Sequence, residues 1–136
     1  MHLDDYAAFG RSSLRVSPLA LGTMTFGEGF AWQSRVKKPA AILDHYLDLG
    51  GNYLDTGRGD AKPDAQTVVG NYLARNSIKR DRLVMAAKFG VDQQGVGLGR
   101  EAIIEACGQT LRRAGPRRIS LSCFFQCGSL MRSYPG

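Results

Sequence analysis

The sequence is poor in the residues and runs that define several protein classes. Its 136 residues include three cysteines and two histidines, and no apolar run approaches the ~20 residues of a membrane span. Neither the histidines nor the cysteine spacing gives a metal-ligand pattern, so no metal site is expected. The odd number of cysteines and the absence of a secretory-signal pattern near the N-terminus indicate reduced thiols, and we expect a cytoplasmic protein with no membrane partner.

Acidic residues are missing from the last part of the chain, where Glu105 is the final one. The net charge of +6 therefore arises mainly from the arginines that follow it. Aromatic residues do not alternate with these basic residues as they do in single-strand binding surfaces, so we expect no nucleic-acid partner. With 43% hydrophobic and 22% charged residues, the composition is that of a globular domain and excludes disordered and collagen-like chains.

Strand-like and helix-like apolar patterns alternate along the chain. Short apolar runs on either side of Gly10 to Ser12 predict a small hairpin at the N-terminus. After it, the patterns predict strands over 18–24, 52–56, 82–89 and 118–125, separated by helices over 39–49, 64–76 and 100–114. Alternating strands and helices indicate parallel strands joined by right-handed crossovers.

Each predicted helix has an apolar stripe that should face the sheet. We expect these residues to be buried: Ile42, Leu43, Tyr46, Leu47 and Leu49 in the first helix; Val68, Val69, Tyr72 and Leu73 in the second; and Ile103, Ile104, Cys107, Leu111 and Ala114 in the third.

The strand ends favour a barrel over a doubly wound sheet. A dinucleotide-binding open sheet normally carries G-x-G-x-x-G after its first strand, and "LGTMTFGEG" lacks that spacing. A (β/α)₈ barrel places its reactive groups at the carboxyl ends of several strands. Thr23, Asp55 and Lys88 all hold such positions. The predicted fold class is therefore α/β, of the parallel (β/α)₈ TIM-barrel type.

Four segments resemble the aldo-keto reductases, which are NAD(P)H-dependent carbonyl reductases with a (β/α)₈ barrel. They are "GRSSLRVSPLALGTMTFGEGFAW", "AAILDHYLDLGGNYLDT", "RDRLVMAAKFG" and "EAIIEACGQTLRR". The likeness extends from about Tyr6 to Ile119, and the motifs follow the order of the family. The resemblance implies a barrel that reduces small aldehydes or ketones.

The resemblance also assigns roles to individual residues. Family members use an aspartate, a tyrosine, a lysine and a histidine, and the lysine, paired with the aspartate, makes the tyrosine a better proton donor. Position by position, the aspartate is Asp55 and the lysine is Lys88. Gly22, Thr23 and Met24 match the first strand tip, which together with Asp55 lies against the cofactor, NADP(H) or NAD(H).

Two positions depart from the family's pattern. The tyrosine of the D-T-A-x-x-Y motif should stand five residues after Asp55, where this chain has Asp60. A carboxylic acid with a reference pKa near ~3.9 is a poor proton donor at neutral pH. The histidine of the family's fourth strand falls on Phe125. We therefore expect negligible carbonyl reductase activity from this chain alone.

The chain is also short for the fold. A complete barrel needs about 200 residues or more, so we expect 1–119 to form the N-terminal half, with four strands, three helices and the hairpin. Residues 120–136 form a divergent tail that would also result from a shifted reading frame or a decayed gene. Open sheet edges suggest self-association, and the alternative to a reductase is a non-catalytic half-barrel that is an interaction module or has no function. Neither the substrate nor the choice between NADPH and NADH follows from the sequence.

Overall fold

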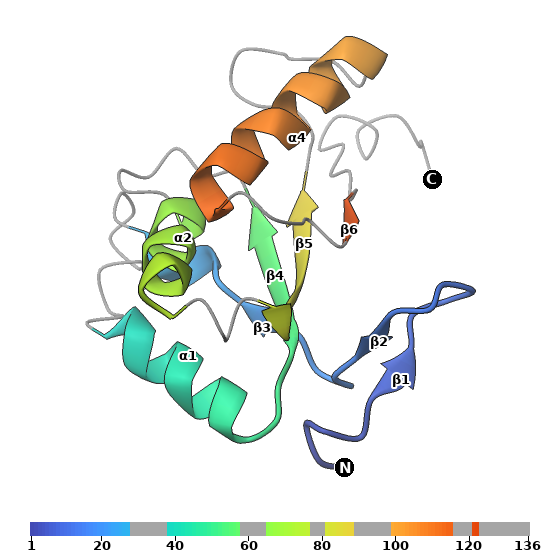
Figure 1. The fold of residues 1–136 in the computed structure, drawn as a ribbon, viewed down its shortest axis with the longest axis vertical. Helices are drawn as coiled ribbons and strands as arrows, with labels where there is room; N and C mark the ends of the chain where they lie inside the picture. The colour runs from blue at the N-terminus through green and yellow to red at the C-terminus, as the bar shows by residue number, and fades with distance from the viewer. Residues whose placement is uncertain (28–37, 58–64, 77–80, 89–98, 116–120, 123–136) are drawn as a thin grey trace, which may run out of the picture.

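The structure is a computed structural model that describes residues 1–27, 38–57, 65–76, 81–88, 99–115 and 121–122, and every statement below concerns these residues (Figure 1). The elements follow one another in the order β1 (Ala7–Ala8), β2 (Arg15–Val16), β3 (Leu21–Gly22), the 3₁₀ helix η1 (Met24–Phe26), α1 (Pro39–Asp48), β4 (Tyr53–Gly57), α2 (Ala65–Arg75), β5 (Val84–Lys88), α4 (Arg100–Ala114) and β6 (Leu121–Ser122).

The strands form two sheets. β1 and β2 pair antiparallel as the predicted hairpin, with Gly10 at a φ of 59° between them. The other four strands form one parallel sheet in the order β3-β4-β5-β6, and the arrowheads of β4, β5 and β6 point the same way in Figure 1. The hairpin, the four parallel strands and the three helices lie in the segments that the sequence predicted. The arrangement is that of a partial TIM barrel.

Local chemistry explains where the helices begin and end. α1 starts at Pro39, because proline fits the first helical turn, where its missing N–H has no partner to lose. The chain leaves α1 through Gly50, whose φ of 87° strains any residue with a side chain. α4 ends in the same way at Gly115, with a φ of 93°. At both positions the positive φ lets the chain change direction after the helix.

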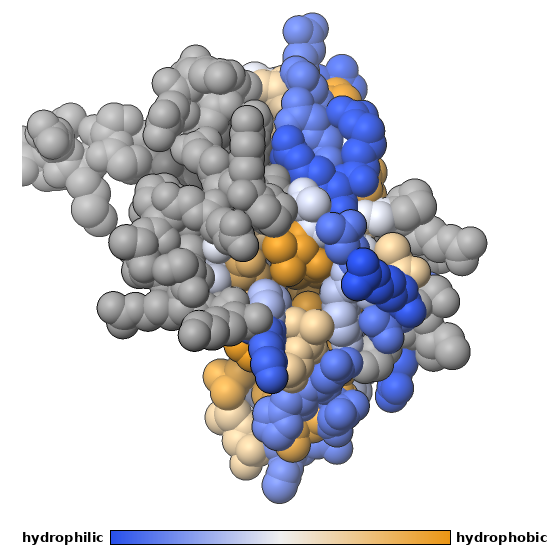
Figure 2. Space-filling view, turned by 90° about the vertical axis from the view of Figure 1, so that its left-hand side faces the viewer, coloured by the Kyte–Doolittle hydropathy of each residue, from blue (hydrophilic) through white to orange (hydrophobic). Residues whose placement is uncertain are grey.

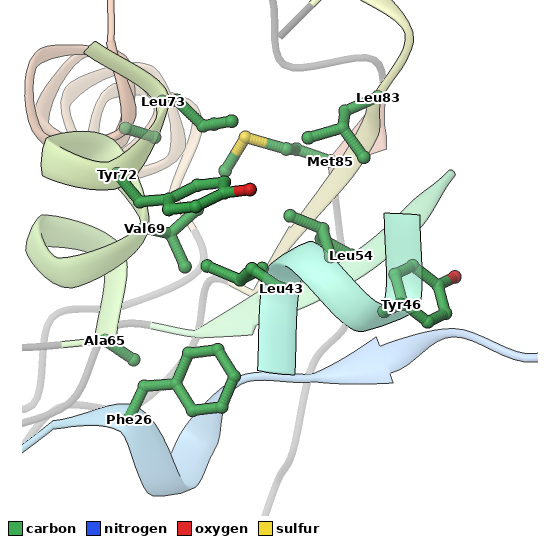
Figure 3. Close-up of a cluster of buried hydrophobic side chains, with 11 residues drawn as sticks. Phe26, Leu43, Tyr46, Leu54, Ala65, Val69, Tyr72, Leu73, Leu83 and Met85 are labelled. Atoms are coloured by element: carbon green, nitrogen blue, oxygen red, sulfur yellow. The ribbon is translucent and has the colours of Figure 1, made fainter. Parts of the chain in front are cut away.

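The hydrophobic core lies between the sheet and its helices. Leu54 of β4 and Met85 of β5 are almost completely buried, and Figure 3 shows Leu43 of α1 beside Leu54. Figure 3 also shows Met85 among the side chains of α2. Alternate residues of a strand point to opposite faces, so Tyr53 and Asp55 lie on the face of β4 turned away from this core. The sheet therefore separates a packed, helix-covered face from the face that carries Asp55.

Hydrogen bonds of buried tyrosines connect the layers. The Tyr46 hydroxyl lies 2.9 Å from the carbonyl oxygens of both Leu19 and Tyr53, and it accepts the Tyr53 N–H at 3.1 Å. A side chain at Gly51 would collide with the Tyr46 ring at 2.4 Å, so glycine is required there. The Tyr72 hydroxyl donates to Asp44 at 2.5 Å and joins α2 to α1.

Three of the side chains predicted to be buried are exposed. Ile42 is 40% exposed, Leu49 54% and Ile104 58%. In α4 the residues that face inward are Thr110 and Ala114, because they lie one turn apart on the side that meets α2. Ile104 lies about 80° around the helix from Ala114, since each residue advances about 100°. The buried stripe is therefore narrower than the apolar pattern indicated.

One face of the molecule shows both polar and apolar groups among the described residues. Figure 2 shows a largely hydrophilic surface toward the top of the view and apolar atoms near the middle of this face. Within the described ranges, no helix has both the length and the apolar character needed to cross a membrane.

The contact between α2 and α4 depends on a glycine. A side-chain carbon at Gly70 would lie 1.9 Å from the carbonyl oxygen of Arg113 and 3.2 Å from the Cα of Ala114. Both obstacles are backbone, so the helices must separate to make room. Gly70 is thus the residue that lets α4 approach the core.

We predict that Gly70→Ala lowers the free energy of unfolding by about 1–3 kcal/mol, the usual cost of forcing extra volume into a packed interface. Gly108→Ala is the matched control, because its nearest obstacle is the flexible end of Arg112 at 3.5 Å. That control should be neutral or stabilising by up to about 1 kcal/mol, since alanine favours a helix over glycine. Urea unfolding followed by circular dichroism measures both; equal stability of the two variants would contradict the contact.

Candidate functional site

The candidate site lies at the carboxyl ends of the parallel strands. Gly22 of β3 stands opposite Asp55 of β4, and Asp55 stands opposite Ala86 of β5. Lys88 is the last residue of β5 and stands opposite Gly57. In parallel sheets the carboxyl ends share one edge, so the strand tips singled out in the sequence meet there, as Figure 1 shows for β4 and β5.

Thr23 fixes the backbone of Asp55 from the neighbouring strand. The Thr23 N–H donates to the Asp55 carbonyl at 3.0 Å, and the Thr23 hydroxyl donates to the same oxygen at 3.1 Å. Thr23 has no exposed surface. Two donors from one buried residue therefore hold the main chain of Asp55, while the Asp55 side chain is half-buried.

Thr56 makes a corresponding contact on the other side of β4. Its hydroxyl donates to the carbonyl of Ala86 at 2.8 Å, and the residue is 1% exposed. Ala86 lies two residues before Lys88 on the same strand. Thr56 thus connects the residue after Asp55 to the part of β5 that leads to Lys88.

The register brings the positions of Asp55 and Lys88 close together. Asp55 and Ala86 form a register pair, and alternate residues of a strand share a face, so positions 55 and 88 lie on the same face. With strands about 4.8 Å apart and a rise of about 3.3 Å per residue, the two Cα atoms should be roughly 8 Å apart. That separation is within reach of a lysine and an aspartate side chain extended toward each other.

The first strand tip leaves open surface next to Asp55. Gly22 is exposed, and a side-chain carbon placed on it would meet no atom within 4 Å. Met24, at the start of η1, is 65% exposed. Phe26, two residues later, is buried in the core and anchors η1. The backbone of the tip is therefore held in place while Gly22 and Met24 remain accessible to a flat ligand.

The other end of the same sheet face is closed by the hairpin. The rings of Phe9 and Tyr53 meet edge to face with their centres 5.8 Å apart. The Tyr6 hydroxyl donates to the carbonyl of Gly50 at 2.7 Å and ties the hairpin to the turn before β4. The hairpin therefore packs at the amino end of β4, away from the strand tips that hold Asp55 and Lys88.

The tyrosines of β4 and α2 make their contacts away from the carboxyl ends of the strands. Tyr53 packs against Phe9 toward the hairpin, and the Tyr72 hydroxyl binds Asp44 on the helix side of the sheet. Asp60 and Phe125, which occupy the expected tyrosine and histidine positions, lie outside the described residues. Among those residues, no cluster of three or more metal-ligating side chains occurs.

The sequence reading missed Thr56 as a member of the site. Its neighbour Asp55 was identified through the family motif, but the direction of the Thr56 hydroxyl depends on the register with β5. The signal that could have revealed it is a hydroxyl in a strand that is otherwise buried, because such a group needs a hydrogen-bond partner.

Comparison with known proteins supports one family. Residues 18–123 match the model of the aldo/keto reductase family. Norsolorinic acid reductase B of Aspergillus parasiticus is 39% identical over 87 residues, which is 62% of this chain and 22% of that protein. The aldo-keto reductase ausK of Aspergillus calidoustus is 33% identical over 106 residues, which is 74% of this chain and 26% of that protein.

A solved structure from Pseudomonas aeruginosa, described as an aldo-keto reductase, has the same fold over the matched region. Its TM-score to this chain is 0.69 at 28% identity, and the match covers 89% of this chain and 47% of that one. The chain thus spans about a quarter of the length of the first two relatives and about half of the solved structure.

Proposed function

Since the chain belongs to the aldo/keto reductase family, we propose that it carries the aspartate–lysine part of a site for NAD(P)H-dependent reduction of aldehydes or ketones. The observation that carries the proposal is the strand register, which sets Asp55 and Lys88 on one face at the carboxyl edge of the sheet. Asp55 is held there by Thr23 through two hydrogen bonds. A cytoplasmic site of action is proposed as well, because an odd number of cysteines is typical of reduced thiols.

The open tip of β3 fits a flat cofactor ring. Gly22 has no side chain to obstruct it, and Met24 offers an exposed, polarisable side chain beside it. Gly22, Met24 and Asp55 would lie against the nicotinamide of NADP(H) or NAD(H), which supplies a hydride when bound, and the fully buried Thr23 would support them from behind. The choice between the two cofactors is left open.

The role of the pair is to adjust a proton donor. A phenol with a reference pKa near ~10 gives up a proton too reluctantly at neutral pH, and a neighbouring ammonium group favours the phenolate. Asp55 would orient the Lys88 ammonium for that purpose. With Asp60 in place of the tyrosine, the pair has no phenol to act on. We therefore propose that the chain alone has impaired catalysis.

We expect NADPH oxidation with a panel of aldehydes to be no faster for this chain than for Lys88→Met. Absorbance at the reduced-nicotinamide band measures the rate. Asp60→Tyr should raise the rate if the missing phenol limits turnover, and Asp60→Phe is the matched control without a hydroxyl. A rate for the unaltered chain clearly above that of Lys88→Met would show that the proposed impairment is wrong.

A second, non-catalytic function is favoured by the edges of the sheet. Among the described strands, β3 and β6 each have a neighbour on one side only. Parallel sheets of this kind are normally closed or covered, because an open edge pairs readily with other chains. Four strands are half of an eight-stranded barrel. We propose that the edge of β3 pairs with β6 of a second copy or with a full-length relative.

Light scattering coupled to gel filtration tests self-pairing. We expect the unaltered chain to form a dimer and Gly22→Lys to be a monomer, because a charged side chain on an edge strand opposes pairing. Gly99→Lys is the matched control, since Gly99 is also exposed with no atom within 4 Å of an added side-chain carbon and lies at the start of α4. A well-folded monomer of the unaltered chain would count against self-pairing.

A further inference from the structure

Two buried hydroxyl groups stand level with each other at the carboxyl edge of the sheet. Gly22 is paired with Asp55, so the next residues, Thr23 and Thr56, occupy the following level. Thr56 in turn is paired with Ala87. Thr23 is 0% exposed and Thr56 is 1% exposed, so neither hydroxyl can rely on water for a partner.

Both hydroxyls use the same kind of partner. Thr23 donates to the carbonyl of Asp55 at 3.1 Å, and Thr56 donates to the carbonyl of Ala86 at 2.8 Å. Each hydrogen bond therefore runs from one strand to its neighbour, and its acceptor is the carbonyl of the residue just before the one that stands level with the threonine. Together they form a series that links β3 to β4 and β4 to β5.

The series ends at the strand that carries Lys88. The third position on the same level is Ala87, which has no hydroxyl and is 2% exposed. The two threonines thus tie together only the strand tips that hold Gly22, Asp55 and Lys88. Valine has nearly the same shape as threonine and would fill the same space in a buried parallel strand, so packing alone does not account for both hydroxyls.

The Thr23 hydroxyl is already committed within the protein. A hydroxyl has one hydrogen to donate, and in Thr23 that hydrogen goes to the Asp55 carbonyl. Contact with a cofactor at this tip would therefore involve Gly22 and Met24, which are exposed, rather than the Thr23 hydroxyl.

We propose that Thr23 and Thr56 are positioning residues, which set the offset between β3, β4 and β5 and thereby hold Asp55 in register with Lys88. The hydrogen bonds and the register support the claim that the threonines set the strand offset. The further claim that this offset favours proton transfer rests on the proposed function of the Asp55–Lys88 pair.

Nuclear magnetic resonance of the ¹³C-labelled chain tests this positioning without requiring turnover. The Asp55 side-chain carboxyl resonance is identified by its loss in Asp55→Asn. We expect Thr23→Val and Thr56→Val to shift this resonance. Thr23→Ser should leave the resonance at the position it has in the unaltered chain, because serine keeps the hydroxyl. Thr110→Val is the matched control: Thr110 is 2% exposed, and its hydroxyl accepts a hydrogen bond from Gln66 in the contact between α2 and α4.

The outcomes separate positioning from general stability. If Thr110→Val shifts the Asp55 resonance as much as Thr23→Val does, the effect is general and the proposal is wrong. An unchanged Asp55 resonance in both Thr23→Val and Thr56→Val would also overturn it.

Lys88→Met tests the proposed function independently of the threonines. If the Asp55 resonance shifts in Thr23→Val and not in Lys88→Met, the proposal that threonines position Asp55 is supported, and the proposal that Asp55 pairs with Lys88 is wrong. A response to both changes supports positioning and pairing together.

Discussion

The pairing of β4 with a parallel strand on each side is the constraint on which the rest of the structure depends. It fixes Asp55 between Gly22 and Ala86 and turns Leu54 toward the helices. A shift of one residue would move Asp55 into the core and Leu54 to the opposite face, with the cost of burying a charge and exposing a large apolar side chain. The core and the candidate site are therefore specified by the same register.

The candidate site and the hydrophobic core lie on opposite faces of the sheet. Helices α1 and α2 pack against the covered face of the sheet, and α4 reaches the core through its close contact at Gly70. Among the described residues, the opposite face carries Asp55, and Phe9 and Tyr53 pack together at its hairpin end. The register that places Asp55 and Lys88 on one face is thus stabilised by packing on the opposite face.

Much of the architecture was predictable because it depends on short-range patterns. Apolar periodicity located the hairpin, the four parallel strands and the three α-helices, but not the 3₁₀ helix η1, which begins where a strand was expected to end; proline marked the start of α1, and glycines followed the ends of α1 and α4. The degree of burial was less predictable: Ile104 has the periodicity of a core residue but is exposed, since it lies away from the side of α4 that meets α2. The contact at Gly70 could not be seen in the sequence either, because it joins residues more than forty positions apart.

The site was predictable only in part. Asp55 and Lys88 came from the resemblance to aldo-keto reductases, and the strand register then placed their positions on one face. Thr56 is the threonine of the family's D-T-A-x-x-Y motif, but the partner of its hydroxyl was not predictable, because it is set by the pairing of two strands thirty residues apart. The distance between the Asp55 carboxylate and the Lys88 ammonium in a crystal structure tests the account most directly. We predict an ion pair within about 4 Å; a lysine directed away from Asp55, with the strand register intact, would contradict it.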